Sequence, residues 1–213
     1  MLGSRANVLL ACALSALAGY VDGIGVLHLG GLFVSFMSGN STRMGVSLAD
    51  GQWMAALEAL GLIVLFVAGA AIGSLIVLGR SAWRQAVVLL AEAALLFAAG
   101  LAHHLGQQPV AVAFIVLAMG IENAVFQIEG GGGLGLTYVT GALVKVGQFL
   151  AAAATGGPRW NWLPNLLLWA ALVAGAAGGA LAYASFNLDA IWIAGVIALA
   201  LAAIVAAGAK RAD

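Results

Sequence analysis

The sequence predicts an all-α integral membrane protein with six spanning helices and two broken or re-entrant elements. Hydrophobic residues make up 64% of the 213 residues and charged residues only 8%. Soluble domains carry about 25% charged residues, so this composition is typical of a chain surrounded by lipid. Apolar runs long enough to cross a bilayer recur along the chain, and motifs from its first half return in its second half.

Six apolar runs have the roughly 20-residue length that a spanning helix needs. They cover residues 7–27, 53–78, 85–105, 110–127, 163–185 and 190–207. The first run could pass for a signal peptide, but it continues beyond Gly19 to Asp22, so we expect it to be retained as a helix. Tryptophans near the ends of these runs fit the aromatic belt of a membrane protein.

Two weaker elements, 32–49 and 134–154, differ from the six runs in the same way. Each begins with an extended-looking stretch, passes a turn of small residues, and continues in a helical pattern. The turns are Ser38-Gly39-Asn40 and Thr140-Gly141-Ala142. We therefore expect each element to be an interrupted helix that enters the membrane without crossing it.

The internal repeat connects these two elements. The segment 39–45 reads GNSTRMG and 141–147 reads GALVKVG, while 67–74 reads VAGAAIGS and 173–180 reads VAGAAGGA. The short motif GYVD at 19–22 likewise matches GIEN at 120–123. The chain thus reads as a single membrane domain, 1–213, built from repeats 5–105 and 106–210.

The positions of lysine and arginine predict the topology. The loop cations are Arg5, Arg80, Arg84, Arg159, Lys210 and Arg211. If the two weak elements do not cross, all six cations lie on the side of both termini, which the positive-inside rule makes cytoplasmic. If both weak elements cross, Arg80 and Arg84 move outside, against that rule. We therefore favour three spans per half, with the halves inverted and both termini cytoplasmic.

Charged residues inside the predicted membrane segments are candidates for function, because burying charge in a bilayer is costly. Asp22 and Glu122 each lie in the first span of a half, with Asn123 at the position that matches Asp22. Arg43 and Lys145 lie in the two weak elements. One interpretation is a pair of structural ion pairs. The other is that Asp22, Glu122 and Asn123 serve proton coupling while the cations receive an anionic or polar substrate.

The small-residue turns extend this candidate site. Each would open a half-helix, whose free amides and positive dipole end favour an anion or a polar oxygen. The predicted substrate-binding residues are Ser38, Gly39, Asn40, Ser41, Arg43, Tyr138, Thr140, Gly141 and Lys145. For any single hydrogen-bonding residue among them, ordinary capping or bonding between helices is the simpler explanation, and it is their shared position that favours a site.

Several other features indicate structure rather than chemistry. The segments VAGAAIGS and VAGAAGGA are small-residue faces for close helix packing, within the chain or in a homodimer. We expect Glu58 and Glu92 near an interface or paired within the bundle. His103 and His104 lack the partners that a metal site needs. No catalytic constellation is present, so we expect no enzyme, no cofactor and no metal, and the zero net charge favours no nucleic-acid partner.

The stretches AGYVDGIGVLHLGGLFVSFMSGNSTRMG and GLTYVTGALVKVGQFLA resemble the YoaK-like bacterial membrane proteins, a family with a domain of unknown function. The resemblance covers nearly the whole chain and implies a bacterial inner-membrane protein with about six helices. It supplies no substrate. This chain carries Ser38 where family members often have threonine, and Ala142 where threonine is common.

Two classes of function follow from the sequence. The first is a secondary transporter, proton-coupled, for a small anionic or polar solute bound near the midplane, because alternating access is commonly built from inverted repeats with broken helices. The second is a passive channel for a small solute or ion, or a membrane-integral partner or scaffold protein without transport activity. The expected partners are the lipid bilayer, the solute and, for a chain this small, a second copy.

Overall fold

A computed structural model shows a helical bundle, of which residues 5–78, 83–126 and 139–210 are described. The helices are α1 (Arg5–His28), α2 (Met37–Ala49), α3 (Trp53–Val77), α4 (Arg84–His104), α5 (Gln108–Glu122), α6 (Val139–Ala154), α7 (Leu163–Phe186), the 3-10 helix η1 (Asn187–Ala190) and α8 (Ile191–Ala209). The described residues contain no strand. The predicted all-α class is therefore confirmed for the described residues.

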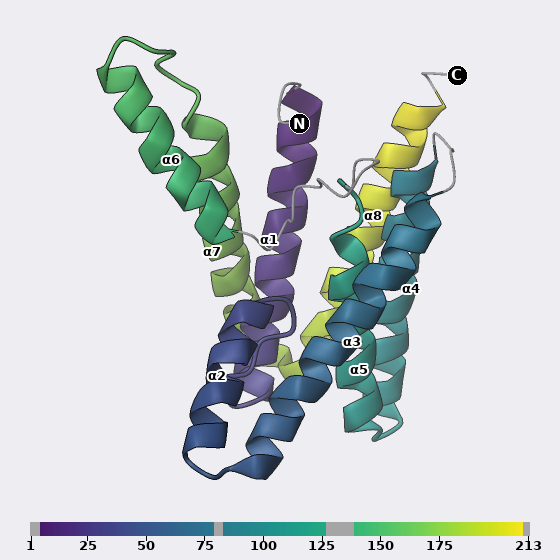
Figure 1. Ribbon diagram of the computed structural model, residues 1–213. Coiled ribbons are helices and arrows are strands. Elements are labelled where there is room, and N and C mark those ends of the chain that lie inside the picture. The colour runs from purple at the N-terminus through teal and green to yellow at the C-terminus, as the bar shows by residue number, and fades with distance from the viewer. Residues whose placement is uncertain (1–4, 79–82, 127–138, 211–213) are drawn as a thin grey trace.

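Four continuous helical stretches are long and apolar enough to cross a membrane, judged by length and composition: residues 7–28, 53–77, 84–104 and 163–209. The last stretch contains both α7 and α8, which run in opposite directions on either side of η1 (Figure 1). At Asn187 the backbone takes a φ of 52°, which turns the chain between them. Helix α5 is shorter than predicted, because residues 123–126 continue in turns after Glu122.

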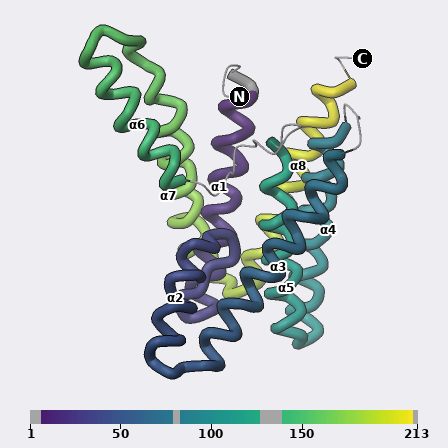
Figure 2. The backbone as a smooth tube through the Cα atoms, in the orientation of Figure 1, coloured from purple at the N-terminus to yellow at the C-terminus, as the bar shows by residue number. Residues whose placement is uncertain are grey.

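The two weak elements are short helices that run in opposite directions. Helix α2 has 13 residues and α6 has 16 described residues. At 1.5 Å per residue these lengths correspond to about 20 and 24 Å, below the roughly 30 Å of a bilayer core. Figures 1 and 2 show both helices starting at mid-height, with α2 descending towards its turn into α3 and α6 rising towards its turn into α7.

Pairs of helices pack with backbones in close approach at glycines. Helix α1 packs along α7, and a side chain at Gly19 or Gly175 would collide with the carbonyl oxygen of Leu172 or Ala16 on the facing helix. Helices α3 and α5 pack in the same manner, with Gly69 facing the Leu117 carbonyl. The small-residue segments therefore serve contacts within the chain, as small residues do at helix interfaces in membranes.

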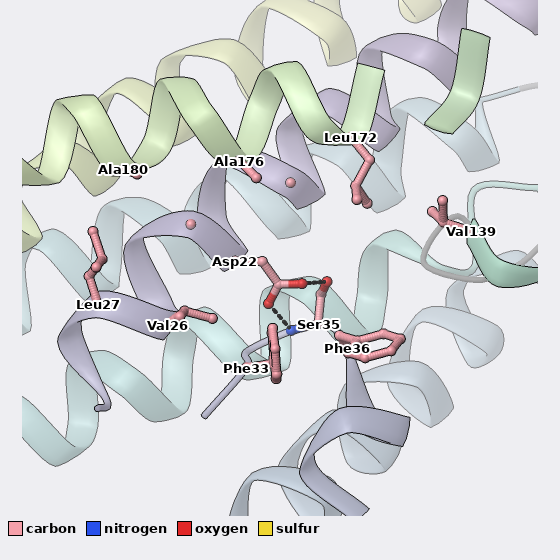
Figure 3. A pocket seen from close by; sticks show the side chains of 12 residues that line it. Asp22, Val26, Leu27, Phe33, Ser35, Phe36, Val139, Leu172, Ala176 and Ala180 are labelled. Carbon is pink, nitrogen blue, oxygen red and sulfur yellow. Dashed lines mark hydrogen bonds between the residues drawn. The ribbon is translucent and has the colours of Figure 1, made fainter. Parts of the chain in front are cut away.

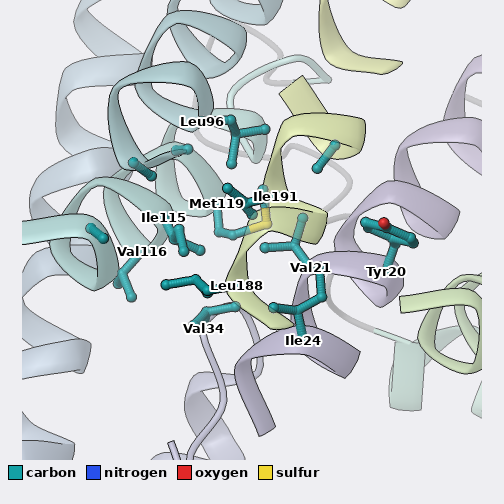
Figure 4. Packing of buried hydrophobic residues seen from close by; sticks show 14 of the residues in the cluster. Tyr20, Val21, Ile24, Val34, Leu96, Ile115, Val116, Met119, Leu188 and Ile191 are labelled. Carbon is teal, nitrogen blue, oxygen red and sulfur yellow. The ribbon is translucent and has the colours of Figure 1, made fainter. Parts of the chain in front are cut away.

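The central core lies where α1, α4, α5, η1 and α8 meet (Figure 4). Its fully buried side chains include Ile24 from α1, Leu96 from α4, Met119 from α5 and Ile191 from α8. Val34, in the segment between α1 and α2, also belongs to this cluster. The entry to α2 is therefore anchored to the core, which positions the first turn of that helix.

Candidate functional site

The first turns of α2 and α6 line the same cavity. A cavity of about 400 Å³ is bordered by Ser35, Phe36, Met37, Ser38, Ser41, Phe66 and Thr140. Ser38 and Ser41 come from α2, Thr140 comes from α6, and Phe66 comes from α3. The N-terminal ends of two helices that run in opposite directions therefore line one cavity.

A second cavity of about 400 Å³ lies beside the first. Its lining includes Asp22 and Gly23 from α1, Ala176 from α7 and Val139 at the start of α6, as Figure 3 shows for the labelled residues. Ser35 and Phe36 line both cavities. These two residues therefore form a shared wall between a mostly apolar chamber and the chamber at the helix starts.

Asp22 holds that wall in place. One of its carboxylate oxygens, Oδ1, accepts hydrogen bonds from the backbone N–H groups of Val34 (2.9 Å) and Ser35 (2.8 Å). The other, Oδ2, accepts from the Ser35 hydroxyl at 2.5 Å (Figure 3). Carboxylates that accept from several donors make the stronger class of hydrogen bond. Asp22 therefore couples the middle of α1 to the segment that leads into α2.

Asn40 closes the same segment from the other side. Its Oδ1 accepts from the backbone N–H of Phe33 at 2.8 Å, and its Nδ2 donates to the Phe33 carbonyl at 2.7 Å. The side chain is fully buried. Asn40 thus has a structural role in the arrangement described, because its polar atoms are engaged with backbone rather than directed into the cavity.

Two further predicted binding residues of α2 also have structural contacts. Gly39 leaves room for the rings of Phe33 and Phe36, which pack edge to face with centroids 5.2 Å apart. The Ser41 hydroxyl donates to the Met37 carbonyl at 2.8 Å. Ser41 lines the cavity, and its hydroxyl oxygen can still accept a hydrogen bond from a donor group of a solute.

The two predicted cations do not pair with the carboxylates. Arg43 is exposed, and its guanidinium lies against Gly31, whose φ of 103° and missing side chain make room for it. Lys145 is exposed on α6. Among the described residues, neither cation forms an ion pair with Asp22 or Glu122, and the ion pairs present join His103 and His104 to Asp189. The interpretation as two structural ion pairs is therefore not supported.

The remaining predicted residues divide into three groups. Gly141 lies in the first turn of α6, and Asn123 donates from its side-chain amide to the Met119 carbonyl of its own helix at 2.9 Å. Tyr138 lies outside the described residues, as do the predicted loop cations Arg80 and Arg211. Glu122 is fully buried at the end of α5 and does not line either cavity.

Sequence reasoning missed three contributions to this region. Ser35 and Phe36 were treated as part of an extended stretch, and no pattern marked them as a wall between cavities. Glu92 was expected near an interface or paired, but it is fully buried and has no hydrogen-bond partner among the described residues. Its position in the middle of an apolar run was the signal that could have identified it.

Comparisons with known proteins agree with a membrane protein. The family described as "Protein of unknown function (DUF1275)" matches residues 10–204. The chain is 39% identical over 201 residues to UPF0700 transmembrane protein RA0705 of Rhizobium meliloti, which covers 94% of this chain and 86% of that relative. It is 31% identical over 136 residues to UPF0700 transmembrane protein YoaK of Bacillus subtilis, which covers 61% of this chain and 60% of YoaK.

No solved structure matches the chain. The predicted resemblance to YoaK-like membrane proteins is confirmed by the family match and by both relatives. The chain is a membrane protein that belongs to the DUF1275 family of transmembrane proteins.

Proposed function

We propose that this protein is a secondary transporter, coupled to protons, for a small anionic or polar solute. The observation that carries the proposal is the cavity shared by the first turns of α2 and α6. The N-terminal end of a helix is the positive end of its dipole, although in α2 the N–H groups of Met37, Gly39 and Asn40 already donate to the carbonyls of Ser35 and Phe36. Two such ends at one cavity, with the hydroxyls of Ser38 and Thr140, favour a solute that offers oxygen acceptors.

The arrangement of helix contacts supports an inverted repeat. Helix α1 packs on α7 as α5 packs on α3, and α2 packs on α3 as α6 packs on α7. If α1 to α4 are exchanged in order for α5 to α8, each of these pairs becomes another pair that is in contact. The pair of α4 and α8, which also pack together, becomes itself. With α2 and α6 as re-entrant helices from opposite faces, the chain has six spans. This is the architecture on which alternating access is commonly built.

The orientation follows from the cations at one end of the bundle. The N- and C-terminal ends of the described chain lie at the same end in Figure 1, together with the start of α4 and the turn between α6 and α7. Arg84, Arg159 and Lys210 belong to these segments. The positive-inside rule then makes this end cytoplasmic in a bacterial inner membrane.

We propose that protons act on the site by binding to the carboxylate of Asp22. As an anion it holds Val34 and Ser35 by three hydrogen bonds. A protonated Asp22 would lose part of its acceptor capacity and the charge that strengthens these bonds. The wall between the two cavities would then loosen, which would link proton binding to access to the site at the start of α2.

Binding can be tested before a substrate is known. Purified protein is screened for thermal stabilisation by small carboxylates, phosphate, sulfate, nitrate and neutral polar solutes, because a ligand at 100 times its dissociation constant adds about 2.7 kcal/mol. Stabilisation by a hit should be lost in Ser38→Ala and Thr140→Val and kept in Thr155→Val, a control in the turn after α6. Equal loss in the control, or no change in the two cavity variants, would contradict this site.

Transport by the hit then separates the proposal from its alternatives. In proteoliposomes, an imposed pH gradient should drive uptake of the solute in the unaltered protein, and Asp22→Asn should abolish the response to the gradient. Flux that saturates poorly and ignores the gradient would instead indicate a passive channel. An absence of flux with any stabilising solute would favour a membrane-integral partner protein.

Topology requires no substrate. In a Cys12→Ser background, single cysteines replace Gln107 in the turn between α4 and α5 and Thr155 in the turn between α6 and α7. With an impermeant thiol reagent on intact cells, the cysteine at 107 should react and the cysteine at 155 should react only after permeabilisation. The reverse pattern would place the cations outside and overturn the proposed orientation.

A further inference from the structure

Two glutamates in the middle of the bundle have no partner for their charge. Glu92 on α4 and Glu122 on α5 are both fully buried. All four of their carboxylate oxygens lack a hydrogen-bond donor within the described part of the chain. Buried polar groups in proteins are nearly always hydrogen-bonded, so two such side chains together need an explanation.

The two side chains act on each other. Helix α4 packs against α5, and the carboxyl groups of Glu92 and Glu122 interact electrostatically, with Asp22 on α1 adding a third acidic influence on Glu122. Asp22 differs from the pair because its oxygens already accept three hydrogen bonds. The pair is therefore a separate acidic centre beside the wall that Asp22 holds.

Helices α3 and α8, which pack against α5 and α4, carry no lysine or arginine between their described ends. Helix α3 contributes Glu58, which is exposed, and α8 contains no titratable residue from Ile191 to Ala209. The Tyr20 hydroxyl of α1 donates to the Ala190 carbonyl at 3.1 Å, and the histidines at the end of α4 face Asp189. Cys12 of α1 is a free cysteine. Within the described ranges no ion pair involves either glutamate.

Two ionised carboxylates cannot remain side by side in this setting, since an isolated buried charge costs far more than a hydrogen bond returns. Either protons or a bound cation must neutralise them. A metal ion would need several ligands, and the described residues contain no group of three or more His, Cys, Asp or Glu side chains arranged to hold one. Protons need only the carboxyl oxygens themselves.

We propose that Glu92 and Glu122 form a buried proton-binding site, in which each carboxyl carries a proton while the α4–α5 interface is closed. When that interface opens to water, one proton dissociates and the other carboxyl remains neutral, because the two side chains cannot both ionise. The pair would bind protons in addition to Asp22, and to that extent it rests on the proposed transport function. Glu122 belongs to a motif of the internal repeat, whereas Glu92 belongs to none of these motifs.

The test is infrared spectroscopy of the purified full-length protein in detergent at neutral pH. A protonated carboxylic acid has a carbonyl stretch distinct from that of a carboxylate, and the band moves on transfer to D₂O. The unaltered protein should show such bands, with Glu92→Gln and Glu122→Gln each removing one of them. Glu58→Gln, the exposed control on α3, should remove none, and Asp22→Asn identifies any contribution from Asp22.

Two outcomes would overturn the proposal. One is the absence, at neutral pH, of any acid carbonyl band that is lost in Glu92→Gln or Glu122→Gln. The other is a pair of bands that appears only when sodium and potassium are replaced by choline, which would mean that a metal cation neutralises the pair. If a glutamine variant does not fold, Glu92→Asp retains a carboxyl and should shift its band rather than remove it. The spectrum needs no transported solute, so this site and the proposed transport can fail separately.

Discussion

Replacing Asp22 should separate the contribution of its oxygen atoms from that of its charge. Oδ1 accepts from the two backbone N–H groups of Val34 and Ser35, while Oδ2 accepts only from the Ser35 hydroxyl. Asp22→Ala removes all three acceptor contacts and leaves two backbone donors without a partner. Asp22→Asn keeps an oxygen for both backbone donors, and its amide can donate to the Ser35 hydroxyl, which then rotates to accept.

The expected magnitudes follow from this geometry. An unsatisfied buried donor costs about 1–3 kcal/mol, so two of them give about 2–6 kcal/mol. Asp22 borders a cavity that water can enter, which places the expected cost of Asp22→Ala in the lower half of that range, about 3 kcal/mol. Asp22→Asn loses only the charge assistance of the bonds and should cost about 1 kcal/mol.

The assay uses the lone cysteine of the chain. Cys12 is partly buried in α1, so a thiol-reactive dye reports unfolding in detergent along an SDS titration. Ser35→Ala removes the hydroxyl contact alone and serves as the matched control, with an expected cost of about 1 kcal/mol. If Asp22→Asn destabilises as much as Asp22→Ala, the charge rather than the acceptor geometry holds the segment, and the reasoning is refuted.

Three further predictions follow from the same structure. Asn40→Ala should cost about 2–4 kcal/mol in the same unfolding assay, because both polar groups of Phe33 lose their buried partner, and a cost below 1 kcal/mol would contradict the role of this clamp. Gly175→Leu should separate α1 from α7 and lower the amount of folded protein recovered in detergent, whereas Gly45→Ala, which meets no neighbouring atom, should be neutral or stabilising by up to about 1 kcal/mol. Cysteines at Ser38 and Thr140 should be joined by a short bifunctional thiol reagent while a pair at Gly45 and Thr140 is not, and equal yields from the two pairs would contradict the shared cavity.

The sequence predicted the helices well because their signal is strong. Apolar runs, glycine turns and small-residue faces can each be recognised from a short stretch of sequence. Small-residue faces predict close helix packing, and the helix backbones do approach closely at Gly19 and Gly175. The end of α5 was predicted at Gln127, whereas the helix ends at Glu122. Apolar residues continue through 124–126, so hydrophobicity alone did not mark that end.

The candidate site could be predicted only in outline. The meeting of the turns at Ser38 and Thr140 follows from the positions of the two weak elements, and it is present in the structure. The partners of Asp22 could not be predicted, because a buried carboxylate can be satisfied equally by a cation or by backbone N–H groups. Here the backbone N–H groups of Val34 and Ser35 donate to Asp22, whereas Arg43 lies against Gly31.

The two half-length helices resemble each other in shape but not in how their first turns are fixed. The start of α2 is held by Asp22 and Asn40 through five hydrogen bonds to residues 33–35. Under the proposed repeat, the matching positions carry Asn123 and Ala142. Asn123 donates to its own helix, and alanine offers no polar side-chain atom. Helix α6 also has no buried residue among those described. Ala142 therefore cannot form at α6 the clamp that Asn40 forms at α2, so the two walls of the shared cavity need not respond equally when a solute or a proton binds.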